Sequence, residues 1–160
     1  MELKEIEKIL AEEGFKVTVN TIDLNGIKTP SLSVLIELDE RPENQGLHLN
    51  VLFVPGVDEQ LQGCHILQLF ITMADTIEGS GEEKIETLTA TLAEFNFNLP
   101  LGAFGIKDYN QMLFYKHMMM MPSKMNEETK ATLIQSVWLI SFLLNQCFPV
   151  IEGILDKEMA

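Results

Sequence analysis

Two segments in the first third of the chain alternate apolar and polar residues with a period of two. They are residues 15–20 and Ser31–Leu38, and a third strand is expected at about Leu47–Val54. This period places alternate side chains on opposite faces, which is typical of a strand packed on one side. Asn25-Gly26 separates the first two segments, and both residues tolerate the positive φ angles of a tight hairpin turn. A polar turn over residues 39–46 follows the second segment. The sequence therefore predicts antiparallel strands joined by hairpins.

Apolar residues spaced three and four apart predict helices in three further places. The first helix covers residues 2–13. Ser80 and Glu83 have the spacing of a capping box, which predicts a second helix that runs to about residue 96. Asn126 is a good N-cap for the last helix, which continues until Pro149 kinks or ends it, with one more turn over residues 150–155.

The second half of the chain contains three further strand candidates. Cys64–Met73 fits either a strand or a buried helical turn, and we favour a strand because it lacks a polar helical face. Two short strands are expected near residues 102–107 and 111–120, with a turn at Asp108-Tyr109-Asn110. The order α-β-β-β-β-α-β-β-α predicts one α+β domain over residues 1–160. Its sheet should be largely antiparallel, with the helices packed on one side.

The chain is acidic, with 11 Lys+Arg against 24 Asp+Glu and a net charge of −13. This charge repels phosphates, so nucleic acid and anionic membranes are not expected as partners. No apolar run reaches the ~18 residues of a membrane span, because Ser141 interrupts the densest stretch, Val137–Leu144. Glu2 and its acidic neighbours stand where a secretory signal would be basic. With two cysteines, Cys64 and Cys147, the simpler interpretation is a reduced, cytoplasmic protein.

Motifs that carry chemistry are not found in the sequence. The candidate soft metal ligands do not show a C-x-x-C or H-x-x-x-H spacing. Nucleophile-elbow, phosphate-loop and dinucleotide-binding motifs are also absent from the sequence. We therefore expect no enzyme activity, no catalytic residues, no metal site and no cofactor. The metal ligands considered are His48, Cys64, His65, His117 and Cys147.

Four consecutive methionines, Met118–Met121, are the most distinctive local feature. In a strand, Met118 and Met120 lie on one face, and Met119 and Met121 lie on the other. The C-terminal helix can cover only one face. The other face is either buried in the core or meets a second subunit or a client, since methionine-rich surfaces repack around varied partners.

The second half of the chain contains three distinctive segments: Leu67–Phe70, the helix end at Phe95–Asn98 and, above all, the N-L-P-L-G-x-F segment Asn98–Phe104. With these segments the chain resembles the YbjN-type family of proposed bacterial sensory transduction regulators. The resemblance covers residues 64–154. It implies the fold of the small acidic chaperones of type III secretion, which are homodimers that hold extended segments of client proteins, although this chain has one strand more. It implies no catalytic residues.

We therefore expect a non-enzymatic protein-binding module, chaperone-like or regulatory, that acts as a homodimer. An extended segment of a protein client would bind to an exposed sheet face or edge. The candidate binding residues are Phe114, Met118 and Met120, with Leu52 and Val54 as weaker candidates. The alternative is a regulatory domain that binds a small ligand between the sheet and the C-terminal helix. The third functional class considered is an enzyme with a pair of carboxyl groups in a cleft.

Overall fold

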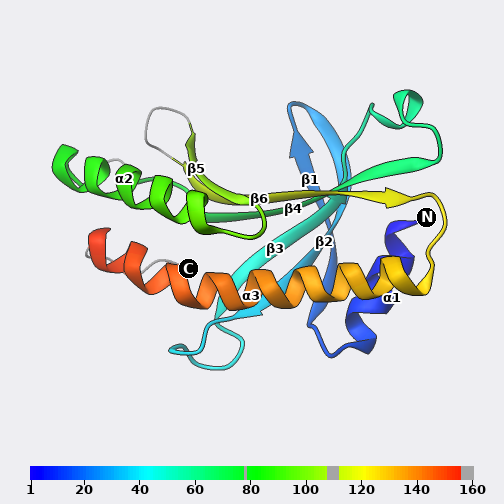
Figure 1. Cartoon of the computed structure of the whole chain (residues 1–160), viewed down its shortest axis with the longest axis horizontal. Coiled ribbons are helices and arrows are strands. Elements are labelled where there is room, and N and C mark those ends of the chain that lie inside the picture. The colour runs from blue at the N-terminus through cyan, green and yellow to red at the C-terminus, as the bar shows by residue number, and fades with distance from the viewer. Residues whose placement is uncertain (78, 108–111, 156–160) are drawn as a thin grey trace.

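The computed structural model describes residues 1–77, 79–107 and 112–155 (Figure 1). The order of helices and strands is the predicted one, with a single turn of 3₁₀ helix, η1, added before the fourth strand. The turn expected at residues 108–110 lies outside the described residues. The elements are α1 (Leu3–Glu12), β1 (Val17–Leu24), β2 (Ile27–Glu37), β3 (Gly46–Phe53), η1 (Asp58–Gln60), β4 (Cys64–Ala74), α2 (Glu82–Asn98), β5 (Ala103–Lys107), β6 (Met112–Pro122) and α3 (Glu127–Leu155).

The six strands form one antiparallel sheet in the order β1-β2-β3-β4-β6-β5. The first four strands follow one another, as the hairpin signals predict. Asn25 and Gly26 both have positive φ angles, 55° and 85°, and connect β1 to β2. After β4 the chain crosses through α2, adds β5 at the edge, and returns as β6 between β5 and β4. The prediction of a largely antiparallel α+β fold is confirmed.

The three helices pack on one face of the sheet and close the hydrophobic core (Figure 1). On β4, the side chains of Leu67, Leu69 and Ile71 point into this core and are fully buried. α3 runs along the sheet and fills the core with side chains that are also fully buried. These are Leu133, Val137, Ile140 and Leu144. The opposite face carries no helix among the described residues, and we call it the open face.

One of the two helix starts predicted from capping residues is wrong. The amide of Thr129 donates a hydrogen bond of 2.8 Å to Oδ1 of Asn126, which confirms Asn126 as the cap of α3. α2, in contrast, begins at Glu82 with Gly81 as its N-cap and has no side-chain capping bond. Ser80 therefore stands one residue too early for the capping box with Glu83. The positive φ of Gly81, 92°, sets the direction in which the chain enters α2.

α3 continues through Pro149 instead of ending there. Ile151 and Leu155, beyond the proline, are 0% and 4% exposed. Their burial offsets the backbone hydrogen bond that a proline cannot donate. α3 is also long and apolar enough to cross a membrane, with one third of its most apolar window buried in the fold. The expectation that no segment reaches that length is therefore wrong. Ser, Thr, Asn and Gln interrupt the apolar run, but they add no charge, so the mean hydropathy of the helix stays high.

Candidate functional site

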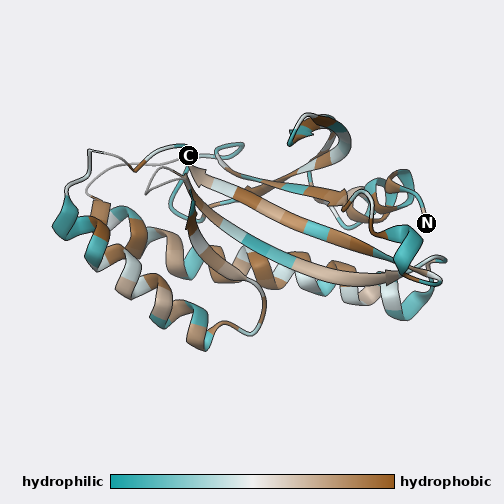
Figure 2. Cartoon of the chain, turned by 90° about the horizontal axis from the view of Figure 1, so that it is seen from above, coloured by the Kyte–Doolittle hydropathy of each residue, from teal (hydrophilic) through white to brown (hydrophobic). Residues whose placement is uncertain are grey.

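The methionine run lies on β6 and divides between the two faces of the sheet as predicted. Met121 is fully buried in the core, and Met119 packs against the core. Met118 and Met120 point to the open face, where they are 42% and 65% exposed. The four residues therefore do not form one core strand, because two of them present flexible thioether side chains to solvent. Figure 2 shows how hydrophobic and hydrophilic residues alternate along the long strands.

Neighbouring residues of β4 extend this apolar surface. In the antiparallel register, Met120 lies opposite Ile66 and Met118 lies opposite Gln68. The outward-facing residues of these two strands include no carboxylate, and Lys116 is the one charged side chain. In a chain with a net charge of −13, this part of the surface is therefore close to neutral. We call it the β4–β6 surface; it consists of Ile66, Gln68, Phe70, Thr72, Phe114, Lys116, Met118 and Met120.

Phe114, the third main candidate, lies at the other end of the same surface. Its ring stacks on that of Phe70, with 5.4 Å between ring centroids. It also lies over Gly105 of β5, where an added Cβ would be 2.4 Å from the ring. These contacts leave Phe114 partly buried and fixed in position. Phe114 therefore forms a rigid end to a surface whose other end is made of methionines.

β5 covers only part of the outer edge of β6. The pairing between the two strands ends at Ala103–Lys116, so residues 117–121 have β4 on one side and no strand on the other within the described chain. Figure 1 shows β5 beside one half of β6 only. Because alternate backbone groups of a strand point to each side, this segment presents free N–H and C=O groups beside Met118 and Met120.

The two weaker candidates, Leu52 and Val54, lie on β3 and directly after it, on the side of β4 that faces away from β6. The register of β3 places Leu52 on the open face opposite Gln68, but its side chain is 0% exposed. It is therefore not available to a partner in this conformation. Val54 follows the end of β3 and is half-buried, and its amide donates a 2.9 Å hydrogen bond to the carbonyl of Ile66. The structure therefore groups three of the candidates on β6, and it places the other two across β4 from Met118 and Met120.

The segment that carries the family resemblance fixes β5 against β6. The side-chain amide of Asn96 brackets the backbone of Phe104: its Oδ1 accepts from the Phe104 amide at 2.7 Å, and its Nδ2 donates to the carbonyl at 2.9 Å. The hydroxyl of Tyr115 donates to the Leu101 carbonyl at 2.9 Å, and burial raises the pKa of that hydroxyl. Gly102 lies directly over this hydroxyl. These contacts explain the N-L-P-L-G-x-F segment by structure alone.

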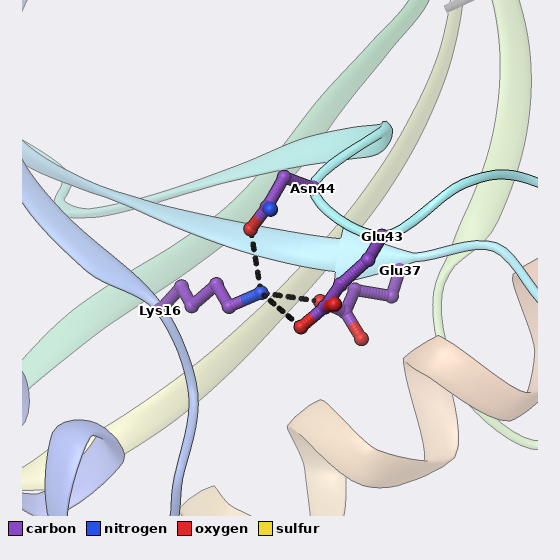
Figure 3. A network of polar contacts seen from close by, with 4 residues as sticks. All are labelled: Lys16, Glu37, Glu43 and Asn44. Carbon is purple, nitrogen blue, oxygen red and sulfur yellow. Dashed lines mark hydrogen bonds and ion pairs between the residues drawn. The ribbon is translucent and has the colours of Figure 1, made fainter.

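Within the described residues, buried core side chains lie between the sheet and α3, and the small-ligand alternative stays a prediction. At the rim of this core there is an open hollow of about 250 Å³, lined by residues that include Phe15, Trp138 and Ser141. Lys16, also on this rim, donates to Glu37 Oε1 at 2.7 Å and to Asn44 Oδ1 at 2.6 Å (Figure 3). The hydrogen bond with Glu37 raises the pKa of Lys16. This network closes the β2–β3 loop onto β1 and is explained without a ligand.

The titratable residues considered for metal binding are His48, Cys64, His65, His117 and Cys147. Within the described ranges, no group of three His, Cys, Asp or Glu side chains is placed to hold a metal ion. Cys64 and Cys147 are both free thiols. Nδ1 of His65 lies 3.1 Å from Oδ1 of Asp58, an isolated pair near η1. Burial lowers the pKa of His117 and raises that of the Cys147 thiol.

Comparison with known proteins shows the fold alone. No protein-family model and no curated protein matches the chain. An uncharacterized protein from Methanothermobacter thermautotrophicus, known as a crystal structure, aligns with 15% identity and a TM-score of 0.50 over 96% of this chain and 98% of that protein. YbjN from E. coli, described as a proposed transcription regulator, aligns with 12% identity and a TM-score of 0.49 over 93% of both chains. The chain is similar to both in fold. YbjN is thus among the structures that align with this chain.

The sequence analysis did not find two features. The free edge of residues 117–121 depends on where β5 ends, which no residue pattern signals. The second feature is Trp138, an apolar residue of the last helix that is 49% exposed. The absence of charge from residues 131–151 could have shown that α3 has an unusual outer face.

Proposed function

We propose that this protein is a non-enzymatic regulatory or adaptor module that binds an extended segment of another protein along β6. The observation that carries the proposal is the unpaired edge of residues 117–121 next to the exposed side chains of Met118 and Met120. A strand added at this edge gains main-chain hydrogen bonds, and every second side chain of it points toward the open face.

The chemistry of the surface defines the client segment. The β4–β6 surface is apolar and lacks carboxylates, so it favours an extended segment with apolar residues at alternate positions. The net charge of −13 attracts basic residues that flank such a segment. Methionine side chains adapt to different apolar partners, which fits a module that accepts related sequences rather than one rigid ligand. The two free thiols fit the cytoplasmic location that we propose for this activity.

The test begins with a selection of peptides from a random displayed library on the purified protein. We expect peptides with apolar residues at every second position. Their dissociation constants are then measured by fluorescence anisotropy against the wild type and a Met118→Glu/Met120→Glu double variant. We expect the double variant to bind at least ~10-fold more weakly, since charges replace apolar contact at the edge. The matched control is Val19→Glu, on the distant edge strand β1 and 67% exposed, which should leave the affinity unchanged.

The main-chain part of the proposal has its own test. Two versions of a selected peptide are N-methylated at alternate amides, one version for each set. Because only one set of amides faces β6, one version should lose binding and the other should keep it. Three results would overturn the proposal. They are a selection that yields no peptide, an equal loss of binding with both N-methylated versions, and an unchanged affinity of the methionine double variant.

A further inference from the structure

The outer side of α3 carries a continuous stripe of exposed residues without charge. Three of its members are large apolar side chains: Trp138 is 49% exposed, Phe142 is 60% exposed and Val150 is 46% exposed. The exposed positions are three or four residues apart, so they follow one side of the helix. We call this set the α3 stripe; it consists of Ala131, Gln135, Trp138, Phe142, Gln146, Pro149, Val150 and Gly153.

The absence of charge from this side of α3 is not explained by burial. Asp, Glu, Lys and Arg make up 22% of the chain, yet none of them occurs in residues 131–151. Inward-facing residues of α3 lie in the core, where charge is excluded, but the α3 stripe faces solvent. An exposed helix face is normally polar and charged. α1 follows that rule, with Glu5, Lys8 and Glu12 exposed on its surface.

We infer that the α3 stripe is the interface of a homodimer in which two α3 helices pack antiparallel about a two-fold axis at Phe142. Two copies with a net charge of −13 repel each other, so contact between them is favoured where charge is absent. A two-fold interface also requires one patch to complement itself. This inference goes beyond the proposed function and does not depend on peptide binding at β6.

The spacing of the stripe meets this requirement. Seven of its eight positions are symmetric about Phe142, at four, seven and eleven residues on either side, and Val150 is the exception. An antiparallel second α3 therefore places Ala131 opposite Gly153, Gln135 opposite Pro149 and Trp138 opposite Gln146. Small residues meet at both ends, which lets the helices approach closely, and the two Phe142 side chains meet at the centre. The hollow beside Trp138 and Ser141, about 250 Å³, leaves room for side chains that enter from the second copy.

A membrane surface fits the α3 stripe less well than a second copy of the chain does. Helices that lie on membranes carry Lys and Arg along their polar side. α3 has one lysine, Lys130, and it also contains Glu127, Glu128 and Glu152. The stripe is about 33 Å long at 1.5 Å per residue. One helix face of this length covers less than the ~800 Å² per partner of a standard interface, so we expect a dimer that dissociates at micromolar concentrations.

The first test is the mass in solution, measured by sedimentation equilibrium from low to high micromolar concentration. We expect the wild type to change from 18.1 kDa toward twice this mass as the concentration rises. Phe142→Glu should stay at 18.1 kDa, with an unchanged circular dichroism spectrum because the side chain is exposed. The control Phe97→Glu, on α2 and 89% exposed, should still dimerise. Added salt should strengthen the dimer, because it screens the repulsion between the two copies.

The second test fixes the arrangement of the helices by disulfide formation. Equivalent positions meet only at the axis, so Phe142→Cys should form a disulfide between copies under mild oxidation. In Gln135→Cys the two thiols are about 21 Å apart along the helix, 14 residues at 1.5 Å each, and should not cross-link. The wild type, which keeps Cys64 and Cys147, is the control for other thiols.

Several outcomes would overturn the inference. One is a wild type that stays monomeric at every concentration, and another is a dimer that survives Phe142→Glu. Cross-linking through Gln135→Cys as readily as through Phe142→Cys would reject the antiparallel arrangement. Binding of monomers to phosphatidylcholine vesicles through Phe142 would assign the stripe to a membrane. The affinity of the Phe142→Glu variant for the selected peptides tests the proposed function separately from the dimer.

Discussion

Gly102 is one of the two most closely packed glycines in the second half of the molecule, and its replacement by alanine should be costly. Its φ angle is 65°, in the left-handed region. A Cβ added there would lie 2.4 Å from the hydroxyl oxygen of Tyr115 and 2.7 Å from the carbonyl oxygen of Lys116. The Tyr115 ring is fully buried, and its hydroxyl donates to the carbonyl of Leu101. The added methyl group therefore strains the backbone and displaces a buried hydrogen bond.

The two effects can be estimated separately. Left-handed backbone costs a residue with a Cβ about 1–2 kcal/mol relative to glycine. Loss of a hydrogen bond that leaves a buried polar group unsatisfied costs about 1–3 kcal/mol. Gly102→Ala should thus lower the free energy of unfolding by about 2–5 kcal/mol, a large share of the ~5–15 kcal/mol that holds a typical domain together.

Gly14→Ala is the matched control for the backbone effect. Gly14 also has a positive φ angle, 92°, but nothing lies within 4 Å of an added Cβ. It should therefore cost only the ~1–2 kcal/mol of backbone strain. Both variants are compared with the wild type by urea denaturation followed by circular dichroism. In a Tyr115→Phe background the excess cost of Gly102→Ala should shrink, because the hydroxyl is gone. Equal costs for Gly102→Ala and Gly14→Ala would refute the argument from close approach.

Two further predictions concern helix capping and pH. Asn126→Ala should lower the free energy of unfolding by ~1 kcal/mol in urea denaturation, because it removes the cap of α3. Ser80→Ala should leave this free energy unchanged, because Ser80 does not cap α2. A lower free energy of unfolding for Ser80→Ala would contradict the observed N-cap. Burial lowers the pKa of His117 below its ordinary value of 6.5, so the unfolded chain binds the proton more readily and stability falls as the pH drops below that value. Urea midpoints measured across this pH range should show a smaller decrease in His117→Gln, and an unchanged decrease would contradict the assignment.

Local sequence signals determined the elements and their order. The period of two in residues 31–38 and the Asn25-Gly26 turn specify strands and a hairpin through backbone geometry, which acts over a few residues. The split of the methionine run between two faces follows from the same period. Helix starts were harder to predict, because a shift of one residue moved the α2 cap from Ser80 to Gly81.

Tertiary structure alone decided which of these surfaces stay exposed. β5 is five residues long and β6 is eleven, and the free edge at residues 117–121 results from that difference in length. The outward register of Leu52 does not make it accessible, since burial depends on what packs above a strand. The same holds for Trp138, whose apolar character gives no direction. Composition and period say which residues are apolar, but contacts between distant segments decide which of them are left for a partner.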